Sequence, residues 1–496
     1  MDVFDPAVFA SLLALVGIVI LASALASGAV ERAGLPSVAL FLGLGLLLGP
    51  HGLGLVDFPL ASPILGAIAT LSLILVLFTD AVSIDMAAFR GHLRLAAIIL
   101  GPGTLLTASL ITLAGWWLLD LPLAGAAILG AALASTDPVM MRGLLRLPDL
   151  PKAARITLGL ESGLNDAVLL PIVLVAMVFL GTSGDPSGGE IGGVAGDVFV
   201  VGPLVGWLVG FLAVRAMGAV RGHYGMRRDY ESLYVLGVAF TAFAVAEALH
   251  GSGFMAAFTA GLSVAALNVE LCDCFHDYGE ASAEMLLLLS FVAFGTSPIW
   301  SGLEVLSLPA VLFAAVALFG RTAVLQLVLP RREVEAGTRR LIVWYGPRAL
   351  SSLLLVLLPV FAGIPGSERL FHLCALVVLF SVVGHGTMLA VVTRMMRSAR
   401  TPRPAAAASY AGSAPGIATL PHAGLVADRE RITLEEMTAL RRAGAPVVLV
   451  DLRRENDFAS LGTQARGAVR VHPDKPVESA AALALPREAW LVAYCA

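Results

Sequence analysis

Two polar motifs interrupt long apolar stretches of this chain: Ser135-Thr136-Asp137-Pro138 and Glu161-Ser162-Gly163-Leu164-Asn165-Asp166. Proline removes a backbone donor and clashes with the preceding turn, so Pro138 predicts a break in a helix. A charge at the centre of a bilayer costs at least about 2.5–3.5 kcal/mol, so acids placed there are candidates for function. The two motifs therefore predict a polar site inside a membrane-spanning helical domain.

The composition agrees with a membrane location. The 496 residues are 58% hydrophobic and 14% charged, whereas soluble domains are about 45–50% apolar and about 25% charged. The net charge of −4 offers no basic surface, so we expect no nucleic-acid partner. Four irregularly spaced cysteines do not predict a disulfide framework. We expect an integral membrane protein, not an enzyme, without a resident cofactor.

Apolar runs of membrane-spanning length follow one another up to residue 397, and helices satisfy their own backbone polar groups in lipid. We predict an all-α polytopic domain of about thirteen transmembrane helices. The predicted runs are Val8–Ser27, Leu35–Leu48, Ile64–Asp80, Leu95–Leu118, Leu123–Met141, Thr157–Leu180, Gly196–Gly218, Ser232–Leu249, Gly253–Leu267, Ala283–Ser297, Leu306–Leu329, Leu341–Phe361 and Leu370–Thr393.

The basic residues indicate the orientation of these helices. With the N-terminus outside, the inner loops hold nearly all the Lys and Arg residues, whereas the outer loops hold only Arg369. This asymmetry follows the positive-inside rule, so we predict a multi-pass protein of the inner membrane with a cytoplasmic C-terminal tail. The inner basic residues are Arg32, Arg90, Arg94, Arg142, Arg146, Lys152, Arg155, Arg221, Arg227, Arg228, Arg331, Arg332, Arg339, Arg340, Arg394, Arg397, Arg400 and Arg403.

Two arginines occur within later apolar runs. Arg348 follows Trp344-Tyr345-Gly346-Pro347, a second helix-breaking signal. Its permanent charge is suited to neutralise an acid that does not titrate, and we predict that it pairs with Glu161 or Asp137. That pairing leaves Asp166 as the acid that exchanges its proton for a cation. We expect Arg321, near the end of its run, to extend toward the membrane interface.

The motifs together resemble the cation–proton antiporter superfamily, on its electroneutral NhaP-like branch. The resemblance covers residues 8–397 and includes Thr136-Asp137-Pro138, Glu161–Asp166, and Gly346-Pro347-Arg348 with Ser351 and Ser352. Leu77-Phe78-Thr79-Asp80 is similar to an acidic motif of the third span, where the family usually has glutamate. The resemblance implies inverted six-helix repeats, two discontinuous crossing helices, a homodimer and alternating access.

The resemblance also implies a site. Asp166, Ser162, the backbone oxygen of Thr136 and Asp80 would hold the ion, as Na⁺ or another monovalent metal ion. Asp137, Asn165, Glu161 and Arg348 would form the supporting network. Asn165 is neutral where electrogenic relatives carry a second aspartate. We therefore expect a 1:1 exchange of a proton for a monovalent cation, with competition at Asp166. The cation we expect first is Na⁺, while the sequence leaves K⁺ and Li⁺ open.

The composition changes after residue 397. Residues 398–431 are rich in Ala, Pro, Ser and Gly and predict a flexible linker. Residues 432–496 resemble part of a rhodanese-like domain, with a helix opened by a capping box at Thr433 and strands at Val447–Asp451, Ala468–Val471 and Trp490–Tyr494. Cys495 falls at the position of that family's nucleophile. The anion-binding loop would follow it, beyond the last residue given, so we expect no sulfur transfer.

Two other interpretations remain open from the sequence. The polar residues could line a monovalent-cation channel, which has no need of proton competition. Alternatively, the membrane domain could sense its surroundings and signal through the tail without transport. A flux that saturates and is inhibited by protons and cations alike distinguishes an antiporter from both.

Overall fold

A computed structural model of the chain describes most of residues 37–399, with gaps at 85–92, 146–149, 183–185, 224–227, 268–272 and 331–335. It also describes short pieces of residues 13–25 and several pieces of the tail between residues 432 and 494. The chain divides into two compact units, Met1–Thr401 and Pro402–Ala496. Most of the first predicted apolar run, Val8–Ser27, and the predicted linker lie outside the described residues.

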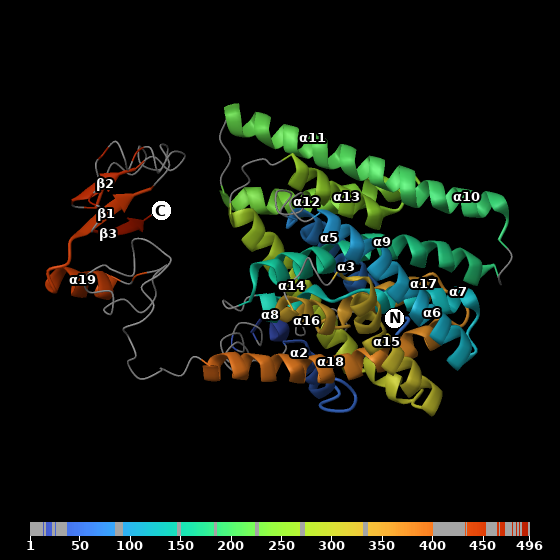
Figure 1. The fold of residues 1–496 in the computed structure, drawn as a ribbon. Helices are drawn as coiled ribbons and strands as arrows, with labels where there is room; N and C mark the ends of the chain where they lie inside the picture. Colours follow the sequence, from blue (N-terminus) through green and yellow to red (C-terminus); the bar gives the residue numbers. More distant parts are fainter. Residues whose placement is uncertain are drawn as a thin grey trace. The chain divides into compact units, whose positions relative to one another are not determined.

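The first unit is built from packed helices (Figure 1). Up to the middle of the unit they are α2 (Ser37–Leu48), α3 (Pro63–Val82), α5 (Leu93–Ile98), α6 (Thr104–Leu119), α7 (Leu123–Ala134), α8 (Pro138–Leu145), α9 (Lys152–Gly181), α10 (Gly188–Gly196), α11 (Gly202–His223) and α12 (Arg228–Ala248). The others are α13 (Gly253–Ala266), α14 (Asp273–Thr296), α15 (Leu308–Val328), α16 (Ala336–Trp344), α17 (Leu350–Phe361) and α18 (Ser367–Ala399).

These helices have the length and composition of membrane spans. Within the described residues, seven continuous helical segments are long and apolar enough to cross a bilayer, and five shorter apolar helices accompany them. Large apolar side chains such as Trp117, Trp207 and Leu327 are exposed on the helix surfaces, as expected for residues that face lipid rather than water. The prediction of a polytopic all-α membrane domain is confirmed.

Both predicted helix breaks are present. The fifth predicted run divides into α7 and α8, which are separated by the extended residues Ser135–Asp137. The twelfth divides into α16 and α17, separated by residues 345–349. A proline stands at each break, Pro138 and Pro347, and each removes a backbone donor that a continuous helix would need. The carbonyls and amides that these breaks release are available to the site.

Small residues allow α7 to lie at the centre of the unit. Nine of its 12 residues are buried, and they are mainly Ala, Gly and Leu. Gly130 touches α6 at Thr112, where an added side chain would collide with the backbone and hydroxyl of α6. Close approach through small residues is the usual packing between helices in lipid. The break at the end of α7 is therefore held by neighbours on several sides.

Some helices begin earlier than the apolar pattern predicts. The run expected to begin at Gly196 is preceded by α10, which starts at Gly188, and a π-helical turn at Asp197–Val201 joins α10 to α11 (Figure 1). A capping box formed by Ser187 and Glu190 fixes this start. Five of the nine residues of α10 are glycine, which is why the segment resembles a loop in the sequence.

The described part of the second unit contains a small parallel sheet and a helix. The strands are β1 (Val447–Asp451), β2 (Ala468–Arg470) and β3 (Trp490–Tyr494), in the order β2-β1-β3. Helix α19 spans Leu434–Arg442, whereas Thr433, its predicted cap, and Cys495 lie outside the described residues. The hydroxyl of Tyr494 donates to Asp451 Oδ2 at 3.0 Å across the sheet. The three strands and the helix occur where the sequence predicts an α/β fragment.

Candidate functional site

The structure brings the residues of the two sequence motifs together in the interior of the first unit. Asp166, Asn165, Ser162 and Glu161 lie on α9, and Thr136 and Asp137 lie in the break between α7 and α8. All six side chains are buried, and Asp166 is only 2% exposed. Within the described residues, Asp166 therefore lies in the interior of the unit and almost out of contact with the surface.

Asp137 connects the two broken helices. Its Oδ1 accepts the backbone N–H of Met140 at 2.9 Å, in the first turn of α8. Its Oδ2 accepts the backbone N–H of Leu350 at 2.8 Å, at the start of α17. The backbone N–H of Asp137 donates to the carbonyl of Pro347 at 3.0 Å. A carboxylate is favourable at a helix N-terminus, and here one carboxylate serves two of them.

The carboxylate of Asp166 faces the first break. Its Oδ1 accepts a hydrogen bond from the hydroxyl of Ser135, and Ser351 at the start of α17 also lies close to it. Among the described residues, its buried Oδ2 has no hydrogen-bond partner. A buried carboxylate oxygen without a partner is costly in a low-dielectric interior. A proton or a cation at this oxygen would remove that cost.

Asn165 and Thr136 form a second link between α9 and the first break. The Nδ2 group of Asn165 donates to Thr136 Oγ1 at 2.8 Å. The buried Oδ1 of Asn165 and the buried hydroxyl of Ser352 have no partner among the described residues. Asn165 adjoins Asp166 on α9, and Ser352 follows Ser351 in the first turn of α17. Oxygen donors of this kind suit hard cations that have lost part of their water shell.

Asp80 approaches α9 from α3. At Gly163 on α9, an added Cβ would lie 3.6 Å from the backbone oxygen of Asp80 and 3.8 Å from its Cβ. Gly163 follows Ser162, whose hydroxyl donates to the carbonyl of Gly159 at 3.3 Å within α9. The structure therefore places Asp80 beside the polar segment of α9. Its place among the ion ligands stays a prediction.

The partner of Glu161 is Arg321, not Arg348. Arg321 Nε donates to Glu161 Oε1 at 2.7 Å, and Arg321 Nη2 donates to Glu161 Oε2 at 2.6 Å. The predicted pairing of Glu161 with Arg348 is wrong. The prediction that Arg321 reaches the membrane interface is also wrong, because its side chain is 3% exposed. The planar guanidinium matches both carboxylate oxygens, which makes this interior position favourable.

Arg321 also caps the end of a broken helix. Its Nη1 donates to the carbonyls of Ile342 and Val343 at 3.0 and 3.3 Å, in the last turn of α16. The last carbonyls of a helix lack intrahelical partners and carry partial negative charge. A buried arginine beside Glu161 satisfies both the acid and this helix end, so Arg321 links α9, α15 and α16.

Arg348 lies in the second break and is fully buried. Its Nη1 donates to the carbonyl of Ser135 at 3.2 Å, one of the carbonyls released by the first break. Its other side-chain nitrogens have no hydrogen-bond partner among the described residues, and both carboxylate oxygens of Asp137 accept backbone N–H groups, so the predicted pairing of Arg348 with Asp137 is also wrong. Arg348 places a permanent positive charge behind the residues that face Asp166.

Sequence reasoning missed the parts played by two residues. Ser135 belongs to the quoted motif, but only the structure shows that its hydroxyl, rather than that of Thr136, reaches Asp166. Neighbouring side chains of an extended segment point in opposite directions. The sequence therefore already indicated that Ser135 and Thr136 would face different groups. Arg321 could have been suspected from the cost of a charge within an apolar run.

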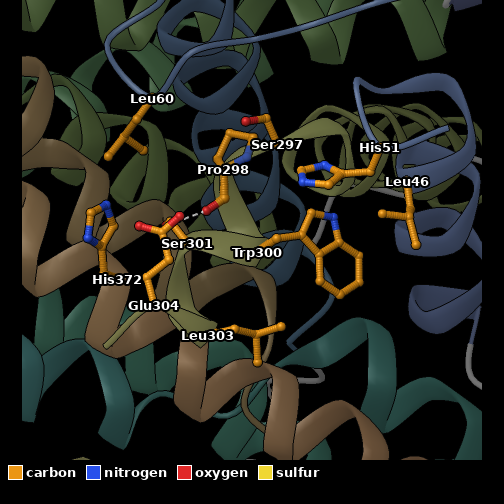
Figure 2. A pocket seen from close by; sticks show the side chains of 10 residues that line it. All are labelled: Leu46, His51, Leu60, Ser297, Pro298, Trp300, Ser301, Leu303, Glu304 and His372. Atoms are coloured by element: carbon orange, nitrogen blue, oxygen red, sulfur yellow. Dashed lines mark hydrogen bonds between the residues drawn. The ribbon is translucent and has the colours of Figure 1, made fainter. Parts of the chain in front are cut away.

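A separate hollow of about 400 Å³ lies between the α2–α3 loop, the short helix Pro298–Leu303 and α18 (Figure 2). His51, Glu304 and His372 line it together with Trp300, and the hydroxyl of Ser301 donates to the carbonyl of Pro298 at 2.7 Å. None of the predicted ion-binding residues lines this hollow. By the predicted orientation it opens on the outer side of the membrane.

The fold and site define a polytopic helical membrane protein in which two broken helices meet beside a buried acid. Residues 18–395 match the family model described as the sodium/hydrogen exchanger, transmembrane, and the chain belongs to this family. The confirmed family agrees with the resemblance identified from the motifs.

Curated relatives include two antiporters. The chain is 28% identical over 389 residues to the K(+)/H(+) antiporter NhaP of Alkalimonas amylolytica, with 77% of this chain and 66% of the relative covered. It is 26% identical over 320 residues to the Na(+)/H(+) antiporter NhaH of Halobacillus aidingensis, with 59% of this chain and 74% of the relative covered. The chain thus spans just under two thirds of the length of the NhaP relative.

The fold is also similar to a solved structure. The sodium proton antiporter MjNhaP1 from Methanocaldococcus jannaschii at pH 8 superposes with a TM-score of 0.62. The superposition covers 77% of this chain and 99% of the other, at 20% sequence identity. At that identity the likeness concerns the fold of the helical unit.

Proposed function

We propose that this chain is a secondary transporter that exchanges a monovalent cation for a proton. The observation that carries the proposal is the environment of Asp166: one carboxylate oxygen is held by Ser135, and the other is buried without a partner among the described residues. Such an oxygen is stabilised either by a proton or by a cation, and the two compete for it.

The neighbouring groups support exchange at a single acid. Asp137 is engaged by three backbone groups and Glu161 is paired with Arg321, so both acids have structural partners. Asn165 beside Asp166 is uncharged. One titrating carboxylate exchanges one proton for one monovalent ion, which moves no net charge. Ser162, the backbone oxygen of Thr136 and Asp80 are the other proposed ligands.

The burial of Asp166 supports alternating access rather than a channel. A channel needs a continuous wet path to its selectivity residues, whereas Asp166 is 2% exposed in this conformation. The ion therefore reaches the site only after helices move. The half-helix ends at the two breaks are suited to such a site because they present partial charges to an ion.

We further propose Na⁺ as the preferred ion, with K⁺ and Li⁺ as competitors to be compared directly. The relatives include both a K(+)/H(+) and a Na(+)/H(+) antiporter. We also propose a homodimer in the inner membrane, with the N-terminus outside and the second unit, a partial rhodanese-like domain, in the cytoplasm.

The test is proton flux in proteoliposomes that contain the full chain. An imposed proton gradient should dissipate when Na⁺ is added, and the cation concentration at half-maximal rate should rise as the pH falls, because protons compete for Asp166. Titrations with Na⁺, K⁺ and Li⁺ at several pH values rank the ions. Flux that neither saturates nor responds to protons in this way would contradict exchange.

A further inference from the structure

Two residues of α18, Ser381 and His385, support the break between α16 and α17, and the proposed exchange does not use them. The backbone N–H of Arg348 donates to Ser381 Oγ at 2.7 Å. Ser381 is buried, and its hydroxyl lies 3.2 Å from Nδ1 of His385, one turn further along α18. The contact crosses 33 residues of sequence and joins α18 to the extended segment between α16 and α17.

The Arg348 N–H fixes the direction of the first hydrogen bond, and the tautomer of His385 decides the direction of the second. A serine hydroxyl has one proton and two acceptor lone pairs. Its oxygen receives the Arg348 N–H, and its proton is free to go to His385 Nδ1 when that atom is unprotonated. The result is a short chain of hydrogen bonds that runs from Arg348 N–H through Ser381 to His385. The hydrogen-bonded chain fixes the hydroxyl in the orientation that accepts from the break.

The other face of His385 contacts the same segment. Its ring meets the ring of Tyr345 edge-on, with centroids 6.1 Å apart, and the hydroxyl of Tyr345 donates to the carbonyl of Met140 in α8 at 3.0 Å. His385 thus contacts the segment between the half-helices at Tyr345 directly and at Arg348 through Ser381. On the opposite side, that segment is bonded to Asp137.

We propose that Ser381 and His385 are positioning residues for the break between α16 and α17, and that transport requires His385 in its neutral form. This inference rests on the proposed antiport. Protonation converts Nδ1 from an acceptor into a donor and removes the acceptor for the Ser381 proton. The charged groups that face His385 are the guanidinium groups of Arg348 and of Arg321 on α15, and its titratable ring neighbour is Tyr345. Protonation therefore also adds positive charge beside two arginines.

The two effects of acid on transport are separable. Protons at Asp166 compete with the cation, so a high cation concentration overcomes them. Protonation of His385 acts on the positioning of the break, so its effect persists when the cation is saturating. In the wild-type chain we therefore expect the maximal rate itself to fall on acidification. In His385→Asn, whose amide oxygen replaces the Nδ1 acceptor and does not titrate, the maximal rate should stay constant.

Ser381 is tested by substitution in the full reconstituted chain. Ser381→Ala leaves the buried Arg348 N–H unpaired, and we expect the maximal rate to fall about tenfold with less than about a twofold change in the cation concentration at half-maximal rate. Ser381→Thr retains the hydroxyl and should transport close to the wild-type rate. The matched control is Thr387→Ala, which removes an exposed hydroxyl that bonds only within α18, to the carbonyl of Val383.

A readout that does not depend on transport separates this inference from the proposed function. Amide hydrogen exchange over residues 345–352 should be faster in Ser381→Ala than in the wild type, Ser381→Thr and Thr387→Ala. Unchanged exchange and an unchanged maximal rate in Ser381→Ala would overturn the positioning role. The same decline of the maximal rate with acid in His385→Asn and in the wild type would overturn the requirement for neutral His385. A silent wild type with altered exchange in Ser381→Ala would contradict the antiport alone.

Discussion

At the scale of single residues, one carboxylate stands apart from the other buried acids. Asp137 is bonded to backbone amides and Glu161 is paired with Arg321, whereas Asp166 retains a buried oxygen without a partner among the described residues. In the proposed exchange, this difference separates the acids that hold the structure from Asp166, the acid that would exchange a proton for a cation. It also decides which substitution should abolish transport without preventing folding.

Asp166→Asn should fold and fail to transport. The amide keeps the shape of the side chain and accepts the hydrogen bond from Ser135, but it has no carboxylate to bind a proton or a cation. We expect cation-driven proton flux to fall to the level of empty vesicles, with unfolding in detergent close to that of the wild type. Asp120→Asn is the matched control, because Asp120 is exposed at the end of α6 in a left-handed conformation that asparagine tolerates. Measurable flux in Asp166→Asn would identify another acid as the exchanging group.

The pair Glu161–Arg321 predicts a coupling between two substitutions. Removing one partner leaves a buried charge uncompensated, so Glu161→Gln alone should destabilise the protein by about 3–5 kcal/mol. The double variant Glu161→Gln/Arg321→Gln should lose much less than the sum of the single losses. Unfolding of the detergent-solubilised variants measures both. A cycle with Arg348→Gln should show a smaller coupling; equal coupling would mean that Glu161 serves both arginines.

The sequence reveals that charges are buried here, but not which ones meet. Glu161 and Arg321 are 160 positions apart, and their contact depends on how α15 packs beside α9. Arg348, which follows a helix-breaking motif, is the more obvious partner, and it bonds to the carbonyl of Ser135 instead. Motifs predict the cost of a charge; only the tertiary arrangement decides its partner.

At the scale of elements, the shared cap at Asp137 should be sensitive to the loss of one acceptor. Asp137→Asn retains a single side-chain oxygen, so either α8 or α17 loses its cap and an N–H group remains buried without a partner. We expect a loss of about 1–3 kcal/mol in the free energy of unfolding. Thermal unfolding in detergent measures it, with Asp120→Asn again as the control. Equal stability of Asp137→Asn and the wild type would show that the two caps are replaceable.

Gly346 predicts a second element-scale effect. A Cβ added there would lie 2.8 Å from Nη1 and 2.9 Å from Cδ of Arg321. Arg321 cannot withdraw easily, because Glu161 and two carbonyls hold its guanidinium. Gly346→Ala should therefore destabilise the protein by about 1–3 kcal/mol. Gly337→Ala in the preceding half-helix, α16, has nothing within 4 Å of the new atom, so its unfolding temperature should not fall.

Most helices, and both breaks, could be predicted from the sequence because lipid imposes long apolar runs and proline interrupts them. The start of α10 could not, because its glycines obscure the helical pattern and its capping box is outside the apolar run. Within the site, the residues on α9 share one helix, so their proximity follows from spacing. The contacts of Ser135 and Ser381 join separate helices that cross in space, and residue spacing along the sequence does not predict which helices cross.

At the scale of the whole molecule, the proposed stoichiometry predicts insensitivity to voltage. Moving one elementary charge through 100 mV is worth about 2.3 kcal/mol, so a charge-moving exchanger should respond strongly to an imposed potential. In sealed proteoliposomes we expect the same flux at potentials of either sign. The control is collapse of the potential by an ionophore during the assay. A flux that follows the sign of the potential would contradict one-for-one exchange while leaving the transport activity intact.

The carboxylate of Asp137 accepts backbone N–H groups of both α8 and α17, so it joins the two interrupted helices directly. Neither helix can slide past the other without breaking these hydrogen bonds, so the proposed alternating access would move both together. A covalent tether from only one of them to the surrounding scaffold should then immobilise both. The chain thereby offers two independent places at which an inhibitor or an engineered cross-link could lock the same motion.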